Sequence, residues 1–164
     1  MTVEWIVAGV LAALLVLGAS LILFSLMAAR HAETLAPPLG TFVEIDGARW
    51  HYVDRGAGPV IVMVHGLAGN LRNFYKLIER LSVDHRVVAV DRPGCGYSIM
   101  LSDEHPGIRA QAALIAQLIR KLDLGQPTIV GHSMGGTLAL ALAIDHPDCA
   151  RALTLIAPLS HVER

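Results

Sequence analysis

The sequence GHSMGG at residues 131–136 lies between two apolar segments of different character. The segment before it, 126–130, is short and rich in β-branched residues, which is typical of a buried strand. The segment after it, 137–146, is rich in Ala and Leu and favours a helix. The pattern therefore predicts a strand that turns sharply into a helix, with Ser133 at the apex of the turn.

The small residues around Ser133 have a steric explanation. A side chain at Gly131 or Gly135 would collide with the backbone of the neighbouring strand or helix, and glycine has no Cβ to collide. The helix begins at the serine, so its free N–H groups face the place where negative charge would develop. A G-x-S-x-G pattern in this context predicts a nucleophilic serine. The alternative is a glycine-rich turn whose serine only caps the helix.

The composition of the 164-residue chain suits one domain and excludes some function classes. A net charge of −1 gives no reason to expect a nucleic acid as partner. Cys95 and Cys149 form no C-x-x-C motif, and none of the eight histidines has a spacing typical of metal ligands. We therefore expect neither a metal site nor a cofactor.

An uncharged N-terminal segment, 5–29, is bracketed by Glu4 and Arg30. As a helix it would measure roughly 37 Å, enough to cross a hydrocarbon core of about 30 Å with some tilt. We predict a single-pass transmembrane helix at 1–30, with the lipid bilayer as the partner of 5–29.

The alternatives to a membrane span are a cleaved signal peptide and a buried core helix. The apolar run is long for a signal peptide, and no Lys or Arg precedes it. Nothing else in the chain could surround a core helix. Arg30 follows the span, which favours a cytoplasmic C-terminal part, although the charge signal is small and the side stays open.

The remaining chain divides into a linker at 31–40, where Pro37 and Pro38 break any helix, and a domain at 41–164. In the domain we expect a β-hairpin at 41–54, strands at 60–64, 86–90, 126–130 and 152–157, and helices at 71–81, 108–122 and 137–146. This alternation predicts an α/β domain, a mostly parallel sheet with helices on both faces. The loops that follow its parallel strands should converge at their carboxyl ends.

Three motifs follow one another in this domain: VMVHGLAGN at 62–70, VVAVDRPGCGYS at 87–98 and VGHSMGG at 130–136. With the hairpin before them, they make residues 41–160 resemble the α/β-hydrolase superfamily, in its esterase, lipase and C–C hydrolase branch. The resemblance implies the α/β-hydrolase fold and a hydrolase that attacks small ester-like substrates.

The resemblance also implies a role for individual residues. Ser133 would be the nucleophile, and the backbone N–H groups of Leu67 and Met134 would form the oxyanion hole. His65 would brace the loop that it shares with Gly66 and would take no part in the proton transfer. A nucleophilic serine, in place of an aspartate, argues against the haloalkane dehalogenases of the same superfamily.

A catalytic serine needs a base that a third group holds in place, and here the base is hard to find. The superfamily places the acid and the histidine after the serine. The titratable residues after Ser133 are Asp145, His146, Asp148, His161 and Glu163. The first three fall roughly 15 Å away, at the far end of the following helix. Only His161 falls at the correct edge, and a loop histidine near a chain end needs no catalytic explanation.

Two further residues near the serine are interpreted without a catalytic role. His132 precedes the serine on the turn and should point away from it. Asp91 ends a strand near the site, and an aspartate in that place is typical of a turn cap. Together with the short length, the missing base predicts a C-terminally incomplete hydrolase.

The strand expected at 152–157 would lie inside the sheet of the superfamily, but here it would be an exposed apolar edge. Such an edge invites aggregation or pairing with a complementing chain. Three functions follow from these observations. The first is a membrane-anchored serine hydrolase with an acyl-serine intermediate. The second is a non-catalytic or fragmentary membrane protein. The third is a C–C hydrolase, peroxidase or acyltransferase that reuses the same serine turn, which the sequence does not separate from an esterase.

Overall fold

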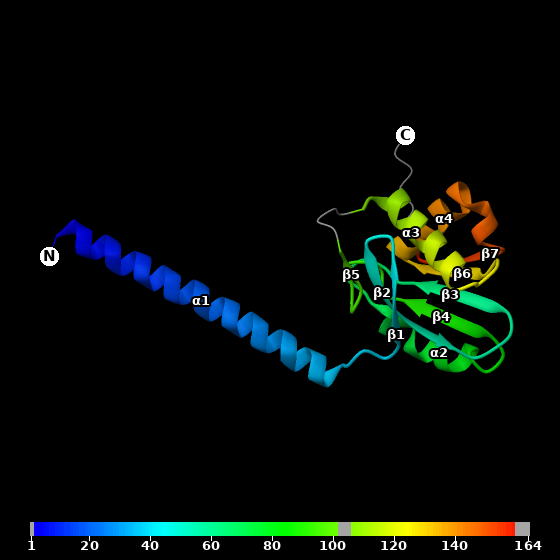
Figure 1. Cartoon of the computed structure of the whole chain (residues 1–164), viewed down its shortest axis with the longest axis horizontal. Coiled ribbons are helices and arrows are strands. Elements are labelled where there is room, and N and C mark those ends of the chain that lie inside the picture. Colours follow the sequence, from blue (N-terminus) through cyan, green and yellow to red (C-terminus); the bar gives the residue numbers. More distant parts are fainter. Residues whose placement is uncertain (1, 102–105, 160–164) are drawn as a thin grey trace. The chain divides into compact units, whose positions relative to one another are not determined.

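The computed structural model describes residues 2–101 and 106–159. The chain divides into two units, Met1–Pro38 and Leu39–Arg164, whose elements are labelled in Figure 1. The first unit consists of α1 (Val3–Leu35), none of whose side chains is buried. It is the one helix among the described residues that is long and apolar enough to cross a membrane.

The end of α1 differs from the predicted boundary at residue 30. The helix continues through Arg30 to Leu35, so the first half of the predicted 31–40 linker is helical. Polar residues tolerate a helical backbone, whereas proline disfavours the helical conformation of the residue before it. Ala36 accordingly takes φ −136° directly before Pro37 and Pro38. The prolines, and not the first charged residue, end the helix.

The second unit contains one twisted sheet. Its strands are β1 (Thr41–Ile45), β2 (Ala48–Arg55), β3 (Val60–Val64), β4 (Arg86–Val90), β5 (Ile99–Met100), β6 (Thr128–His132) and β7 (Ala152–Ile156). The order is β1-β2-β4-β3-β6-β7, and the two-residue β5 pairs with β2. The neighbours β4, β3, β6 and β7 are parallel, while β1 and β2 are antiparallel to their neighbours. The predicted mostly parallel sheet is therefore confirmed, and β5 is the strand that the sequence did not reveal.

Helices cover both faces of this sheet, as predicted (Figure 1). They are η1 (Leu71–Phe74), α2 (Tyr75–Leu81), α3 (Ile108–Lys121), α4 (Met134–Asp145) and η2 (Pro147–Cys149). Phe74 and Ile78 pack on one face of the sheet, in a cluster with Met63. The helices α3 and α4 pack on the other face, where Ile115 and Leu138 belong to the larger cluster. Each parallel strand thus has its apolar side chains covered, except at β7.

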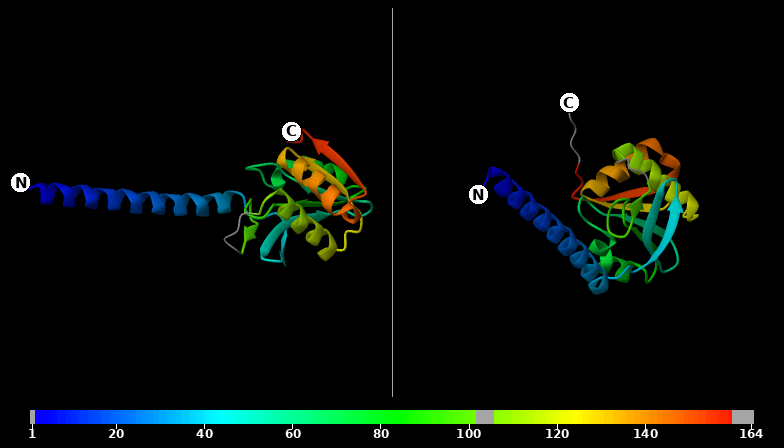
Figure 2. Two further views of the ribbon diagram at one scale, coloured as in Figure 1. Left: turned by 90° about the horizontal axis from the view of Figure 1, so that it is seen from above. Right: turned by 60° about the vertical axis from the view of Figure 1, so that its left-hand side comes forward.

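The strand β7 forms the edge of the sheet that Figure 2 shows in red. Among the described residues it pairs only with β6, and four of its five side chains are exposed. The prediction of an exposed apolar edge near 152–157 is therefore confirmed.

Candidate active site

The turn between β6 and α4 holds Ser133 in an unusual backbone conformation. Its φ is 52° and its ψ is −120°, a region that non-glycine residues rarely adopt and that is concentrated at functional sites. A Cβ at Gly131 would lie 2.4 Å from the Gly135 carbonyl oxygen, and a Cβ at Gly135 would lie 2.1 Å from that of Val64. The expected strand–turn–helix is thus present, and only glycine fits at positions 131 and 135, two residues before and two residues after the serine.

The backbone of Ser133 is tied to the segment at the end of β7. Its N–H donates to the Ile156 carbonyl over 2.9 Å, and its carbonyl accepts from the Leu159 N–H over 3.1 Å. A Cβ at Gly136 would lie 2.8 Å from Pro158 Cβ, which explains the second glycine of the motif. The Thr137 hydroxyl also donates to the Leu159 carbonyl. Contacts with the end of β7 and with the residues that follow it therefore help to hold the strained turn.

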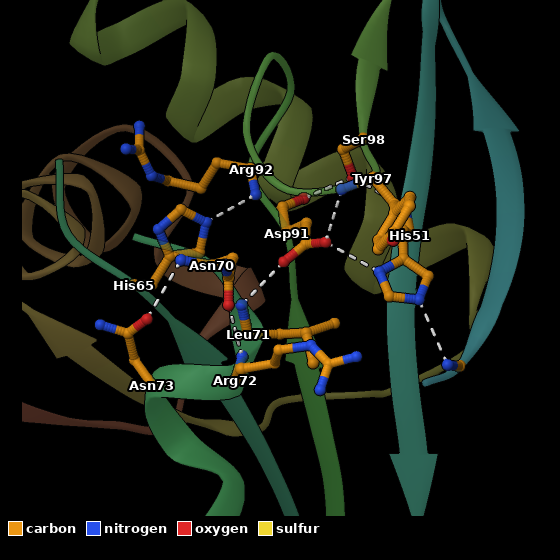
Figure 3. Close-up of polar contacts among 11 residues, drawn as sticks. His51, His65, Asn70, Leu71, Arg72, Asn73, Asp91, Arg92, Tyr97 and Ser98 are labelled. Atoms are coloured by element: carbon orange, nitrogen blue, oxygen red, sulfur yellow. Dashed lines mark hydrogen bonds and ion pairs between the residues drawn. The ribbon is translucent and has the colours of Figure 1, made fainter. Parts of the chain in front are cut away.

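The loop after β3 reaches the serine. A Cβ at Gly66 would lie 2.9 Å from Ser133 Cβ, so the two residues are in contact. The buried His65 ring lies beside them, with its Nδ1 2.8 Å from the Gly66 carbonyl oxygen. Its Nε2 accepts the Arg92 backbone N–H over 3.0 Å (Figure 3). The loops after β3, β4 and β6 thus converge, as predicted.

These two hydrogen bonds define the state of His65. Since Nε2 accepts a hydrogen bond from a backbone amide, the ring proton must reside on Nδ1, which donates a hydrogen bond to the Gly66 carbonyl oxygen. Burial is the main cause that lowers the pKa of His65 below its ordinary value of 6.5. A neutral ring that joins the loops after β3 and β4 fits a brace, which is the role that the family resemblance implies.

Two backbone N–H groups, those of Leu67 and Met134, belong to the loop and the helix that flank Ser133. No described residue accepts a hydrogen bond from the N–H of Leu67 or of Met134. Met134 is the first residue of α4, so its N–H has no partner within the helix and lies at the positive end of the helix dipole. Leu67 directly follows Gly66, and its side chain is 75% exposed. Both N–H groups therefore have no acceptor among residues 2–101 and 106–159.

Asp91 organises the surrounding loops and does more than cap its own turn (Figure 3). Its carboxylate accepts the Tyr97 N–H over 2.9 Å, as a turn cap would, but also the Leu71 N–H over 2.7 Å. The same carboxylate lies 2.8 Å from Nδ1 of the buried His51 on β2. His51 Nε2 in turn accepts the Gly40 N–H over 3.2 Å, so the cluster reaches the start of the domain.

Sequence reasoning missed His51 and Arg92. The Arg92 guanidinium donates to the Gly66 carbonyl over 3.0 Å, so it contacts the loop that touches Ser133. The alternation of residues along β2 does not distinguish His51 from its neighbours, so the sequence carries no signal for its role. Nothing local to either residue indicates a partner 40 or 26 positions away.

The candidates for a base are not brought to the serine. Asp145 pairs with Arg109 at 3.4 Å, and Asp148 pairs with Arg120 at 3.2 Å. The hydrogen bond from Arg120 lowers the pKa of Asp148. His146 follows the last residue of α4, far from the turn.

His132 lines a hollow of about 220 Å³ beside α2, together with Leu77 and Ile156. His161 and Glu163 lie outside the described residues. Within 2–101 and 106–159, no side chain hydrogen-bonds the Ser133 hydroxyl, and no group of three His, Cys, Asp or Glu residues could hold a metal.

Comparisons with known proteins define the family. Residues 59–163 match the family described as alpha/beta hydrolase fold, and the chain therefore belongs to it. It is 35% identical over 116 residues to a Magnesium-chelatase 30 kDa subunit of Rhodobacter capsulatus. It is 32% identical over 129 residues to a 2-hydroxymuconate semialdehyde hydrolase of a Pseudomonas species. The solved structure of a membrane phospholipase A, a bacterial virulence factor, superposes with a TM-score of 0.71 at 26% identity.

The chain spans about half or less of each of these proteins. The matches cover 70%, 77% and 93% of this chain, but only 40%, 46% and 51% of the respective relatives. The relatives therefore contain further residues to which no part of this chain is matched.

Proposed function

We propose that this chain is part of a membrane-anchored serine hydrolase that acts on small ester-like carbonyl substrates. The observation that carries the proposal is Ser133 itself, held at φ 52° on a glycine-flanked turn and in contact with the loop of Gly66. The hydrolases among the relatives support the reaction class. The apolar helix α1 supports the anchor, and the membrane phospholipase supports a site close to lipid.

The proposed reaction proceeds through an acyl-serine. The Ser133 hydroxyl oxygen attacks the substrate carbonyl carbon, while its proton passes to a base. The carbonyl oxygen becomes an oxyanion that the Leu67 and Met134 N–H groups bind. The oxyanion then collapses to a carbonyl and the C–O bond to the alkoxide breaks, while the protonated base gives its proton to the alkoxide. Water attacks the acyl-serine with loss of a proton to the base, the acid leaves, and the proton returns to the Ser133 oxygen. We place the base outside residues 2–101 and 106–159, with His161 as the candidate that this chain itself carries.

Labelling with a fluorophosphonate tests the nucleophile. The full chain in detergent micelles should be labelled at Ser133, and Ser133→Ala should remove the label. Ser82→Ala, which changes a half-buried serine directly after α2, is the matched control and should be labelled normally. If the base is missing, added imidazole should accelerate the labelling, because it accepts the proton that Ser133 must lose.

A second variant locates the base. If His161 accepts the proton, His161→Ala should slow labelling about 100-fold, within the range for general-base catalysis, and imidazole should restore it. If His161→Ala is labelled as fast as wild type, the base does not come from His161.

The alternative is a non-catalytic module on the same scaffold. The observation that favours it is the Ser133 hydroxyl, which no described side chain hydrogen-bonds. In that case a folded chain would remain unlabelled with and without imidazole. Labelling that depends on Ser133 would exclude this alternative.

A further inference from the structure

Arg92 is a buried cation with neutral partners. Its side chain is only 3% exposed, and its Nη1 donates to Gln111 Oε1 over 2.8 Å. Its Nη2 donates to the Gly66 carbonyl oxygen over 3.0 Å. Among the described residues no carboxylate forms an ion pair with it. A buried charge is costly unless it is compensated, so this placement calls for an explanation.

The Gly66 carbonyl is the point on which several donors converge. Besides Arg92 Nη2, it accepts His65 Nδ1–H over 2.8 Å and the Gly69 N–H over 3.3 Å. A carbonyl oxygen has two lone pairs, so three donors use its full capacity as an acceptor. Together they restrain the orientation of the Gly66 C=O bond. The peptide plane between Gly66 and Leu67 cannot rotate without loss of these bonds.

The direction of that carbonyl determines the direction of the Leu67 N–H. Both groups belong to one planar peptide, and the described residues contain no cis peptide bond. In a trans peptide the C=O and the N–H point in opposite directions. Donors on the Gly66 oxygen therefore turn the Leu67 N–H the other way, and no described residue accepts a hydrogen bond from it.

The charge of Arg92 also acts through the peptide. A cation at the carbonyl oxygen favours the resonance form with negative oxygen and positive nitrogen. The N–H of the same peptide then becomes a stronger donor, as in other polarised hydrogen-bond chains of low dielectric. The effect is useful only where an anion forms on the far side of the peptide.

We propose that Arg92 is a positioning residue that orients and polarises the Gly66–Leu67 peptide, so that the Leu67 N–H binds the oxyanion formed at Ser133. The inference rests on the proposed function. Arg92, in the loop after β4, would thus affect the reaction only through the Gly66–Leu67 peptide.

The test measures the labelling of Ser133 by a fluorophosphonate, separated into the probe affinity KI and the rate constant kinact. In Arg92→Gln we expect kinact to fall about 10- to 100-fold, somewhat less than the loss of a whole oxyanion donor, with KI unchanged. Arg92→Lys keeps the charge and one donor and should lose less. The amide resonance of Leu67 should shift in Arg92→Gln more than any other leucine amide, which a loss of packing alone would not cause.

Arg109→Gln is the matched control, because it removes a guanidinium that is 81% exposed, and its kinact should equal that of wild type. A folded Arg92→Gln variant with wild-type kinact would overturn the role of Arg92 and leave the proposed function intact. Wild-type protein that is never labelled, even with imidazole, would overturn both. If Arg92→Gln does not fold, Gln111→Leu loosens the guanidinium instead, and an unchanged kinact there counts against the proposal.

Discussion

At the scale of single residues, the site depends on close approaches of backbone to backbone. Gly135 is the clearest case, because its Cα lies against the last residues of β3. An added Cβ would meet the Val64 carbonyl oxygen at 2.1 Å, and neither backbone can move without disturbing β3 or α4. The glycine therefore sets the distance between the helix that carries the serine and the strand that leads to Gly66.

Gly135→Ala should destabilise the domain by about 1–3 kcal/mol or more, as expected for overpacking against backbone. Tm, measured by near-ultraviolet circular dichroism in detergent, should fall by about 5 °C or more. Gly107→Ala is the matched control, because nothing lies within 4 Å of its added Cβ. Equal melting temperatures for the two variants would contradict the steric argument.

The neutral state of His65 makes the stability depend on pH. Its pKa lies below the ordinary 6.5 in the folded chain, mainly because of burial. In the unfolded chain the ring binds a proton at about pH 6.5. Between the two values the unfolded state holds more protons, so stability falls as the pH falls below about 6.5 and is independent of this group above it.

His65→Gln should therefore reduce the loss of Tm between pH 7.5 and pH 5. Glutamine can still donate to Gly66 and accept from the Arg92 N–H, so the loop keeps its bonds. His85→Gln, at a partly exposed histidine paired with Asp84, provides the comparison. If His65→Gln loses as much Tm as wild type on acidification, burial of this ring does not account for the pH dependence.

Local patterns predicted some of these residues and missed others. The glycines around Ser133 follow from a strand-to-helix turn, which is a property of six consecutive residues. The hydrogen bond from Arg92 to the Gly66 carbonyl oxygen could not be predicted, since the two residues are 26 positions apart and meet only when β3 and β4 pair. His51 and Asp91 meet for the same reason, through the pairing of β2 with β4.

At the scale of elements, α1 differs from the other helices in its length and its apolar composition. Its 33 residues measure about 50 Å, more than a hydrocarbon core of about 30 Å requires. The charged residues after position 29 therefore extend beyond the apolar part of the same helix. None of its described side chains is buried.

Charges in the middle of α1 should abolish membrane integration, if the helix is the anchor that we propose. Leu17→Arg with Leu21→Arg adds two charges near the centre, which costs about 5 kcal/mol or more in total. The double variant should move to the supernatant on alkaline carbonate extraction. Leu35→Arg, in the last turn of α1, is the control and should stay in the membrane fraction. Retention of the double variant would argue against a span.

At the scale of the whole molecule, β7 is a strand with one edge that no described strand pairs. It pairs with β6 on one side only, and an unpaired edge presents free N–H and C=O groups to other chains. The strand also ends beside the hollow that His132 and Ile156 line. We propose that this edge pairs with a complementing segment. When that segment is absent, the edges of two copies of the chain pair with each other.

A lysine on that edge should reduce the self-association. Thr154→Lys places a charge in the middle of β7, where Thr154 is exposed, and sedimentation velocity in detergent should show a shift toward the monomer. Thr41→Lys, on the strand β1 at the opposite edge, is the control and should sediment like wild type. If Thr154→Lys associates as strongly as wild type, β7 is not the contact.

The sequence by itself determined the order of strands and helices, the glycine-flanked turn at Ser133, the apolar helix and the membership of 41–160 in an α/β architecture. These features depend on short-range periodicity and on the conformational limits of glycine and proline. Only the tertiary structure decided the contacts around the serine: the hydrogen bonds of His65 and Arg92 to Gly66, the pair of His51 with Asp91, and a hydroxyl that no described side chain hydrogen-bonds. Those contacts join residues on different strands, and distant residues meet only where the sheet brings its strands side by side.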